Sequence, residues 1–133
     1  MADALHVELV AADRTVWSGD AEMVIARTVE GDLGVLRGHA PVLSLLSEAV
    51  VEVRVKDSDE VVVAAVDGGF ISVALDRVSI LSEHIELGDE IDVAKAQAEL
   101  DEAEAKVGED DDAEARVRHA EAQLRAAEKV RQS

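Results

Sequence analysis

The spacing of apolar residues along this chain changes once, close to residue 88. Before that point apolar residues recur at every second position, as in Leu5, Val7 and Leu9. This alternation is typical of β-strands that bury one face. Residues 61–66 are apolar throughout, which predicts a strand buried on both faces. The chain before residue 88 is therefore predicted to form β-structure.

Short polar or glycine-containing segments separate the apolar runs and are predicted to be turns. They include Trp17–Asp20 and the pair of glycines at 68–69. The strands expected between the turns cover residues 5–11, 21–29, 33–36, 51–55, 61–66, 70–75, 78–81 and 84–87. About eight to ten strands with frequent turns predict an antiparallel β-sandwich or a flattened barrel.

After residue 88 apolar residues recur at intervals of three and four, which is the spacing of one helix face. The first series is Val93, Ala96, Leu100, Ala103 and Val107, and the second is Ala113, Val117, Ala120, Leu124 and Ala127. Asp92 can cap the first helix, and Gly108 is placed to end it. An acidic loop, residues 109–112, joins the two series. The pattern therefore predicts an antiparallel two-helix hairpin.

This change of period divides the chain into a β-sandwich domain, residues 1–87, and a helical hairpin domain, residues 88–133. The hairpin offers few branched apolar side chains, each worth about 1.5–3 kcal/mol when fully buried. Ordering each backbone residue costs about 1–2 kcal/mol, so the hairpin is predicted to be marginal without something to pack on. It could be a plain surface hairpin, or a switch element with two packings of similar free energy.

Charge and composition narrow the classes of function. Of the 133 residues, 30 are acidic and 13 are Lys or Arg, which gives a formal net charge of −17. Such an acidic surface repels nucleic-acid phosphates and anionic lipid headgroups, which argues against binding either. The chain has no cysteine, and its longest apolar run is far too short to cross a bilayer. Any association with a membrane is therefore expected to come through a partner.

The sequence contains no pattern typical of a catalytic or metal site. The four histidines, His6, His39, His84 and His119, have no metal-ligand spacing. The serines lie outside any nucleophile elbow. The glycine-rich stretch at 31–38 lacks the Gly-Lys-Ser/Thr end of a phosphate loop. The chain is predicted to have no enzymatic activity of its own.

The stretch GDLGVLRGHAPVL (Gly31–Leu43) contains three of the eight glycines and the only proline. On its own it indicates turns around a short strand. It also resembles the signature of the ε subunit of F-type ATP synthases, with Arg37 where that family usually has Pro. Three more segments resemble parts of that family and follow in the same order. They are Trp17-Ser18-Gly19, Val66-Asp67-Gly68-Gly69-Phe70 and Val78–Leu81. On these motifs the chain is identified as a member of that family.

The resemblance implies a non-catalytic rotor subunit of a proton-translocating enzyme. In the family the β-domain binds the γ subunit and the ring of c subunits. In the family the helical hairpin is also mobile. It inhibits ATP hydrolysis when it extends along γ and transiently meets the α/β catalytic head. The c-ring-facing turn would then carry Gly31, Asp32, Gly38 and His39. The isolated chain would be a monomer, held at the cytoplasmic face of the cell membrane only through the complex.

The resemblance also implies a nucleotide site. Ile91-Asp92-Val93-Ala94-Lys95-Ala96 resembles the family's Ile/Leu-Asp-x-x-Arg-Ala motif, at which some bacterial members bind ATP. Lys95 stands where Arg is usual, and its ammonium is a point charge rather than a planar fork. The phosphates could also be held by Arg116, Arg118 and Arg125 of the second helix. The same motif can instead be a capped helix start that binds no cofactor.

Two other classes of function fit the residues alone. One is a stand-alone β-sandwich interaction module that dimerises through its helical hairpin, and it predicts a stable homodimer. The other is a soluble ATP sensor, which predicts ATP binding without a synthase partner.

Overall fold

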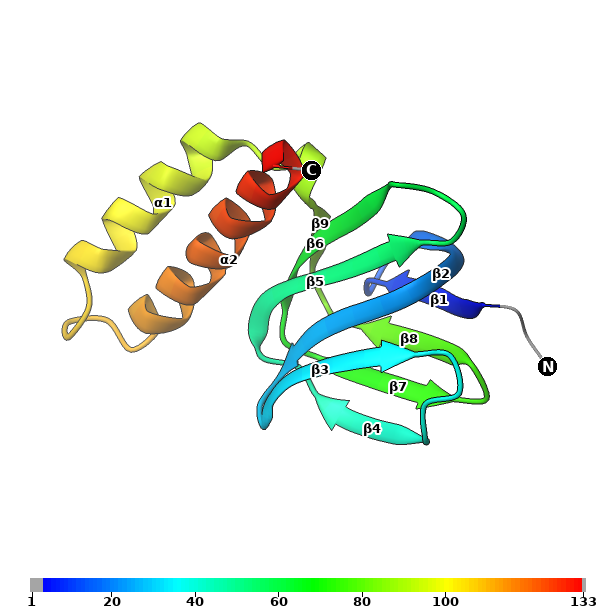
Figure 1. Cartoon of the computed structure of the whole chain (residues 1–133). Helices are drawn as coiled ribbons and strands as arrows, with labels where there is room; N and C mark the ends of the chain where they lie inside the picture. The colour runs from blue at the N-terminus through cyan, green and yellow to red at the C-terminus, as the bar shows by residue number, and fades with distance from the viewer. Residues whose placement is uncertain (1–3, 133) are drawn as a thin grey trace.

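The computed structural model describes residues 4–132. Residues 1–3 and 133, at the outer ends of the two predicted domains, lie outside the described residues. The described chain forms nine strands: β1 (Leu5–Val10), β2 (Thr15–Thr28), β3 (Gly31–Leu36), β4 (Val42–Leu45), β5 (Glu48–Val55), β6 (Val61–Asp67), β7 (Phe70–Ala74), β8 (Arg77–Leu81) and β9 (Ile85–Leu87). A short 3₁₀ turn, η1 (Gly88–Glu90), leads into two helices, α1 (Val93–Ala105) and α2 (Ala113–Gln132). Figure 1 shows the strands as a sandwich and the two helices stacked on one side of it.

The strands pair in the order β4-β7-β8-β1-β2-β5-β6-β9, and β3 pairs with β2. β2 is 14 residues long and joins the layers: its first half pairs with β1, its second half pairs with β3, and β5 pairs along its centre. The predicted β-sandwich is confirmed, but it is not wholly antiparallel, because β1 and β8 run parallel. Most of the domain separates these two strands in the sequence, so no short turn fixes their relative direction.

The predicted turn at Trp17–Asp20 is wrong, because these residues lie within β2. They pair with β1, with Trp17 opposite Leu9 and Gly19 opposite Val7. A side chain at position 19 would place its Cβ 2.9 Å from the Trp17 ring atom Cη2. Gly19 is therefore needed for the close approach of the indole rather than for a turn.

The interior of the sandwich is built from aliphatic side chains of all its central strands. Its largest fully buried members are Leu5, Leu9, Ile71 and Ile80, packed with valines of β1, β2, β3, β5, β6, β7 and β8. No residue of α1 or α2 belongs to this core cluster. The sandwich therefore has a hydrophobic core of its own.

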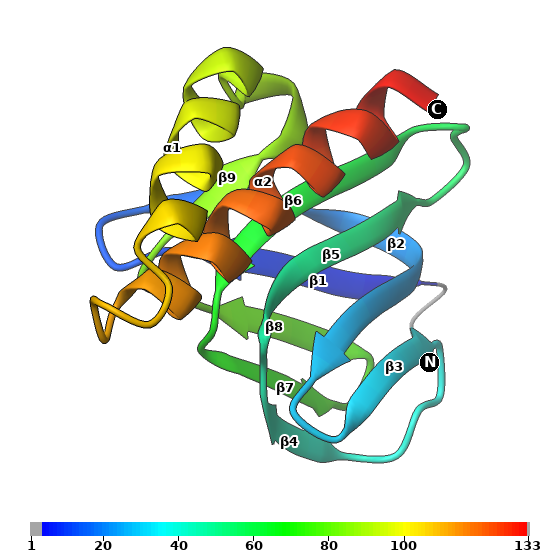
Figure 2. The same ribbon diagram turned by 90° about the vertical axis from the view of Figure 1, so that its left-hand side faces the viewer.

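The helices cover the outer face of β5 and β6, as the view in Figure 2 shows. Ala122 and Ala126 of α2 pack against Val63 and Ala65 of β6 in a small separate cluster. β6 is thus buried on both faces, as its apolar run predicts: Val63 and Ala65 meet the helix, while Ala64 and Val66 belong to the core.

α1 is the outermost layer and packs on α2, not on the sandwich. The two helices meet through small side chains, with Ala96 and Ala103 of α1 and Ala113 and Ala120 of α2 fully or almost fully buried. The predicted first helix is shorter than expected: it ends at Ala105, and Val93 and Val107 at the ends of its apolar series are 38% and 45% exposed. The helical hairpin thus meets the rest of the chain mainly through one face of α2.

Gly88, at the start of η1, is packed against the last turns of α2. A Cβ atom at this position would be 2.6 Å from Cγ2 of Val130 and 2.8 Å from the carbonyl oxygen of Ala126. The backbone oxygen cannot swing away as a side chain can, so the absence of a side chain at position 88 is a condition for the docked position of α2.

Gly88→Ala is expected to weaken the docking of α2 by about 1–3 kcal/mol, because the added methyl group overpacks this contact. Amide hydrogen exchange of the full chain measures it: exchange should become faster throughout α2 and stay slow in β1 and β2. Gly34→Ala is the matched control, since Gly34 lies in β3 without a positive φ and its Cβ would meet only the Met23 methyl group, at 3.4 Å. Unchanged protection of α2 in the Gly88 variant would contradict the close contact.

Candidate functional site

The stretch predicted to face the c ring forms two turns rather than one. Gly31 and Asp32 begin β3, whereas Gly38 and His39 follow its other end. Because a strand extends by about 3.3 Å per residue, these two pairs lie at opposite ends of one edge strand. β3 pairs only with β2, so its other edge is not covered by a further strand among the described residues.

Each turn is held by a different contact. Asp32 Oδ1 lies 3.3 Å from Arg27 Nε on the neighbouring strand. The Gly38 N–H donates to Asp76 Oδ1 at 2.7 Å, and His39 Nδ1 lies 2.7 Å from the carbonyl oxygen of Ala40. Asp32 is exposed and His39 is half-buried, so both could meet a partner along this edge.

An exposed apolar face, which the sequence patterns did not reveal, lies on the outer side of β4, β7 and β8. Its members are Leu43, Leu45, Phe70 and Leu81, with exposed fractions of 73%, 50%, 47% and 43%. Leu45, Phe70 and Leu81 form one row across the three strands, because Leu45 pairs with Phe70 and Phe70 with Leu81. A contiguous exposed apolar patch of this kind marks a protein interaction site.

Polar contacts tie α2 to the sandwich on both sides of its alanine contact. Arg118 Nε donates to Glu48 Oε2 at 2.9 Å, and Lys129 Nζ lies 3.5 Å from Glu52 Oε2. These pairs are partly exposed and each is worth less than about 1 kcal/mol. A shorter bond is less exposed: Gln123 Nε2 donates to Glu86 Oε1 at 2.6 Å. The Gln123 amide oxygen is buried without a hydrogen-bond partner among the described residues.

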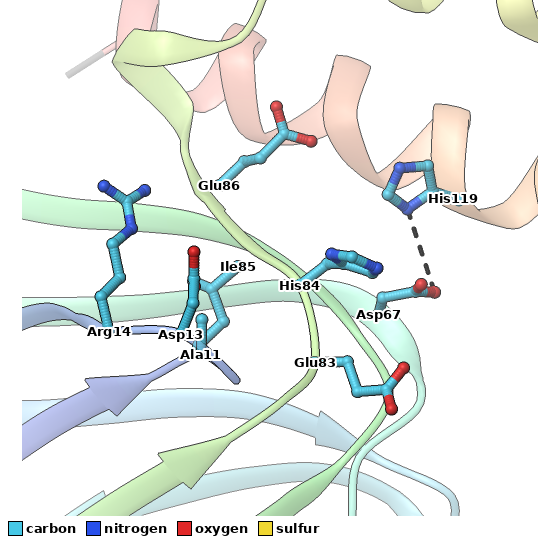
Figure 3. Close-up of a pocket in the computed structure, with 9 residues that line it drawn as sticks. All are labelled: Ala11, Asp13, Arg14, Asp67, Glu83, His84, Ile85, Glu86 and His119. Carbon is cyan, nitrogen blue, oxygen red and sulfur yellow. Dashed lines mark ion pairs between the residues drawn. The ribbon is translucent and has the colours of Figure 1, made fainter.

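A cavity of about 480 Å³ opens beside this interface, between the start of α2, β9 and the turn after β1. Figure 3 shows His119 of α2 pointing toward Asp67 of β6, with Nδ1 and Oδ1 3.9 Å apart. The lining residues are Ala11, Asp13, Arg14, Asp67, Glu83, His84, Ile85, Glu86 and His119. No group of three or more potential ligands within residues 4–132 is arranged to hold a metal ion.

The candidate nucleotide residues are not gathered into one pocket. Asp92 caps α1 by accepting from the Lys95 N–H at 3.1 Å, which confirms the capped helix start. Arg116 lies near the start of α2 and pairs with Asp110 at 3.0 Å, whereas Lys95 lies in the first turn of α1.

Of the other two candidate arginines, Arg118 is bound to Glu48, and it lines a cavity on the sandwich side of α2 together with Arg125. Neither Ile91 nor Ala96 lines that cavity. ATP binding by this set of residues therefore stays a prediction. None of the helices within the described residues is both long and apolar enough to cross a bilayer.

The described chain is a β-sandwich that carries a two-helix hairpin on one outer face. Residues 4–88 match the family model described as ATP synthase, Delta/Epsilon chain, beta-sandwich domain. The ATP synthase epsilon chain of Streptomyces griseus is 52% identical over 126 residues, covering 95% of this chain and 97% of that relative. The epsilon chain of Streptomyces coelicolor is 51% identical over 127 residues, covering 96% and 98%.

Solved structures agree with these relatives. A chain of the mitochondrial ATP synthase of Euglena gracilis superposes with a TM-score of 0.74 at 26% identity, covering 99% of this chain and 82% of that one. A chain from the central stalk and c ring of the Tetrahymena thermophila enzyme shares the fold, with a TM-score of 0.55 at 15% identity, covering 96% of each chain. The present chain belongs to the family of ATP synthase epsilon chains, the non-catalytic central-stalk subunits of F-type ATP synthases.

Glu86→Ala is expected to weaken the docking of α2 by about 1–3 kcal/mol, because it leaves the buried Gln123 amide without its acceptor. The double variant Glu86→Ala/Gln123→Leu should cost less than the single one, since no buried amide then remains unpaired. Arg118→Ala, which removes a half-exposed ion pair, should cost less than about 1 kcal/mol. Hydrogen exchange of the α2 amides in the full chain measures the loss of docking free energy for each of the three variants. A double variant that costs more than Glu86→Ala alone would contradict this account.

Proposed function

We propose that the sandwich of this chain couples the γ subunit to the c ring, and that its helical hairpin restrains ATP hydrolysis by leaving the docked position. One observation carries the proposal: the hairpin shares no residue with the core of the sandwich and is attached to it through one face of α2. The two parts can therefore separate without unfolding the sandwich. The protein would lie at the cytoplasmic face of the cell membrane as part of the complex.

The sandwich offers two separate surfaces for its two partners. The apolar face on β4, β7 and β8 suits a broad, permanent contact, since obligate interfaces are rich in apolar side chains. We assign it to γ. The β3 edge is narrow, with Asp32 near one end and His39 past the other, and we assign it to the loops of the c ring.

The charges of α2 support an exchange of partners by the hairpin. In the docked state Arg118 and Lys129 lie beside carboxylates of β5. When the hairpin extends, these side chains lose those carboxylates and can meet others on the catalytic head. Similar contacts in the extended position would keep the free-energy difference between the two positions small enough for regulation. The docked helices would measure about 20 and 30 Å at 1.5 Å per residue, long enough to reach along a central shaft.

A chain truncated after Gly88 is expected to fold and to bind γ, because the core of the sandwich contains no helix residue. The enzyme assembled with it should hydrolyse ATP faster than the enzyme assembled with the full chain. Thermal unfolding and co-purification with γ test the first statement, and steady-state hydrolysis tests the second. An enzyme assembled without the chain sets the uninhibited rate. Equal rates with truncated and full chains would refute inhibition by the hairpin.

Gly38→Val is expected to reduce proton-driven ATP synthesis while hydrolysis by the catalytic head is largely kept. Gly38 has φ +83°, where a β-branched side chain is strongly disfavoured, so the turn beside the β3 edge must distort. ATP synthesis by the complex reconstituted in vesicles measures the loss. Gly108→Val is the matched control, since Gly108 has φ +92° but lies in the loop between α1 and α2. Full synthesis by the Gly38 variant would count against a coupling role of this edge.

A further inference from the structure

Leu75 stands out as both strained and exposed. It is the first of the two residues that connect β7 to β8, and its side chain is 91% exposed. Its φ is +51°, and that of the next residue, Asp76, is +61°. The exposed fraction is the highest of any large apolar residue in the described chain.

This conformation is unfavourable for leucine in the isolated chain. A two-residue hairpin turn with positive φ at both positions is of type I′, which favours Asn-Gly or Asp-Gly. A leucine there has its Cβ close to the following carbonyl oxygen, and its apolar side chain gains nothing from burial. Neither the turn nor the core of the sandwich therefore accounts for the leucine. Strain kept at an exposed position points to a role outside the folded chain.

The turn at Leu75 and Asp76 is fixed by two hydrogen bonds, although the Leu75 side chain is exposed. The Asp76 carboxylate accepts from the Gly38 N–H at 2.7 Å, and its backbone oxygen accepts from the His6 N–H at 2.9 Å. The first bond joins the tip of β7 and β8 to the loop after β3. Leu75 is thus presented rigidly next to the end of the proposed ring-facing edge.

Basic and apolar residues surround the tip. Leu36, at the end of β3, is 57% exposed, and Arg37 and Arg77 are exposed on the two joined turns. The acid of the turn itself, Asp76, accepts from the Gly38 N–H, and the next acids, Glu8 and Asp20, lie beside His6, the partner of Arg77 on β1. The chemistry that fits such a surface is an apolar socket bordered by carboxylates.

We propose that Leu75 is a knob that inserts into an apolar, acid-bordered socket on the c ring. This rests on the proposed function, which places the ring at the β3 edge; the Gly38–Asp76 bond makes the Leu75 turn continuous with that edge. The knob keeps the sandwich in register with the ring during rotation. It is distinct from the apolar face assigned to γ, because that face is formed by strands and Leu75 projects from their end.

The test compares the affinity of the full chain for two assemblies that lack it: the soluble catalytic part with γ, and the whole enzyme with γ and the c ring. Leu75→Asn should leave affinity for the first unchanged and lower affinity for the second by about 10- to 100-fold, the range expected for losing one buried leucine. Leu75→Met, which keeps the apolar volume, should lower it less than about threefold. Val107→Asn is the matched control, as Val107 is an exposed apolar residue between α1 and α2.

The melting temperature of the free chain gives the second readout. Leu75→Asn should leave it unchanged or raise it by a few degrees, because asparagine tolerates this backbone conformation better than leucine. A lower melting temperature would show that Leu75 stabilises the sandwich and would overturn the proposal. Equal losses of affinity for both assemblies would show that Leu75 contacts γ and would overturn the ring contact. No loss of affinity for either assembly would show that Leu75 contacts neither partner and would overturn the proposal. If the unchanged chain bound neither assembly, the proposed function itself would fail.

Discussion

The contact of Ala122 and Ala126 with Val63 and Ala65 is the constraint on which the position of the whole hairpin depends. α1 packs on α2, so both helices are held in place mainly by this one face of α2. Small side chains bring the helix close to the strand, and Gly88 allows the same closeness at its end. The alanines bury little apolar area themselves, so most of the apolar burial in this contact comes from Val63 and from the branched residues packed around it, Val50, Val61, Ile91 and Val130.

The polar contacts around the alanines fix the orientation of α2 more than they add to its docking free energy. Arg118 and Lys129 meet carboxylates in partly exposed positions, where water and salt screen the attraction. Gln123 is the exception, because its amide is buried and its oxygen has no partner in the described chain. A helix that leaves a polar atom unpaired when docked regains hydration when it leaves. This lowers the free-energy cost of releasing α2, as the movement proposed for the hairpin requires.

The sandwich, unlike the hairpin, is held together by an extensive core. Its core is continuous and aliphatic, and the long strand β2 binds the layers together through pairs with β1, β3 and β5. A stable body of this kind can carry several partner surfaces at fixed positions. The apolar face and the Leu75 tip lie on different parts of it, whereas Asp32 at the start of β3 lines a cavity together with Arg125 and Lys129 of α2. Because the hairpin is outside the core of the sandwich, the movement proposed for it would leave the sandwich folded.

The sequence by itself determined the elements whose evidence lies among neighbouring residues. Alternation identified most of the strands, though not β4 or the first half of β2. The three-and-four spacing identified both helices, and Asp92 marked the start of α1. The motif at Gly31–Leu43 identified the family through resemblance. Only the tertiary structure decided which segments meet across the fold. It placed Trp17–Asp20 within a strand, because β1 supplies hydrogen-bond partners there, and it made β1 and β8 parallel.

It also set Asp32 and His39 at opposite ends of β3, and it brought together the apolar face and the Leu75 tip from separate strands. Arg116 was separated in the same way from Arg118 and Arg125, which line one cavity, since the spacing of residues along a helix does not tell which neighbour each will meet. The physical reason is that periodicity records whether a side chain is buried, whereas a site requires particular side chains to be close. That closeness is fixed by strand pairing and helix packing between residues far apart in the chain.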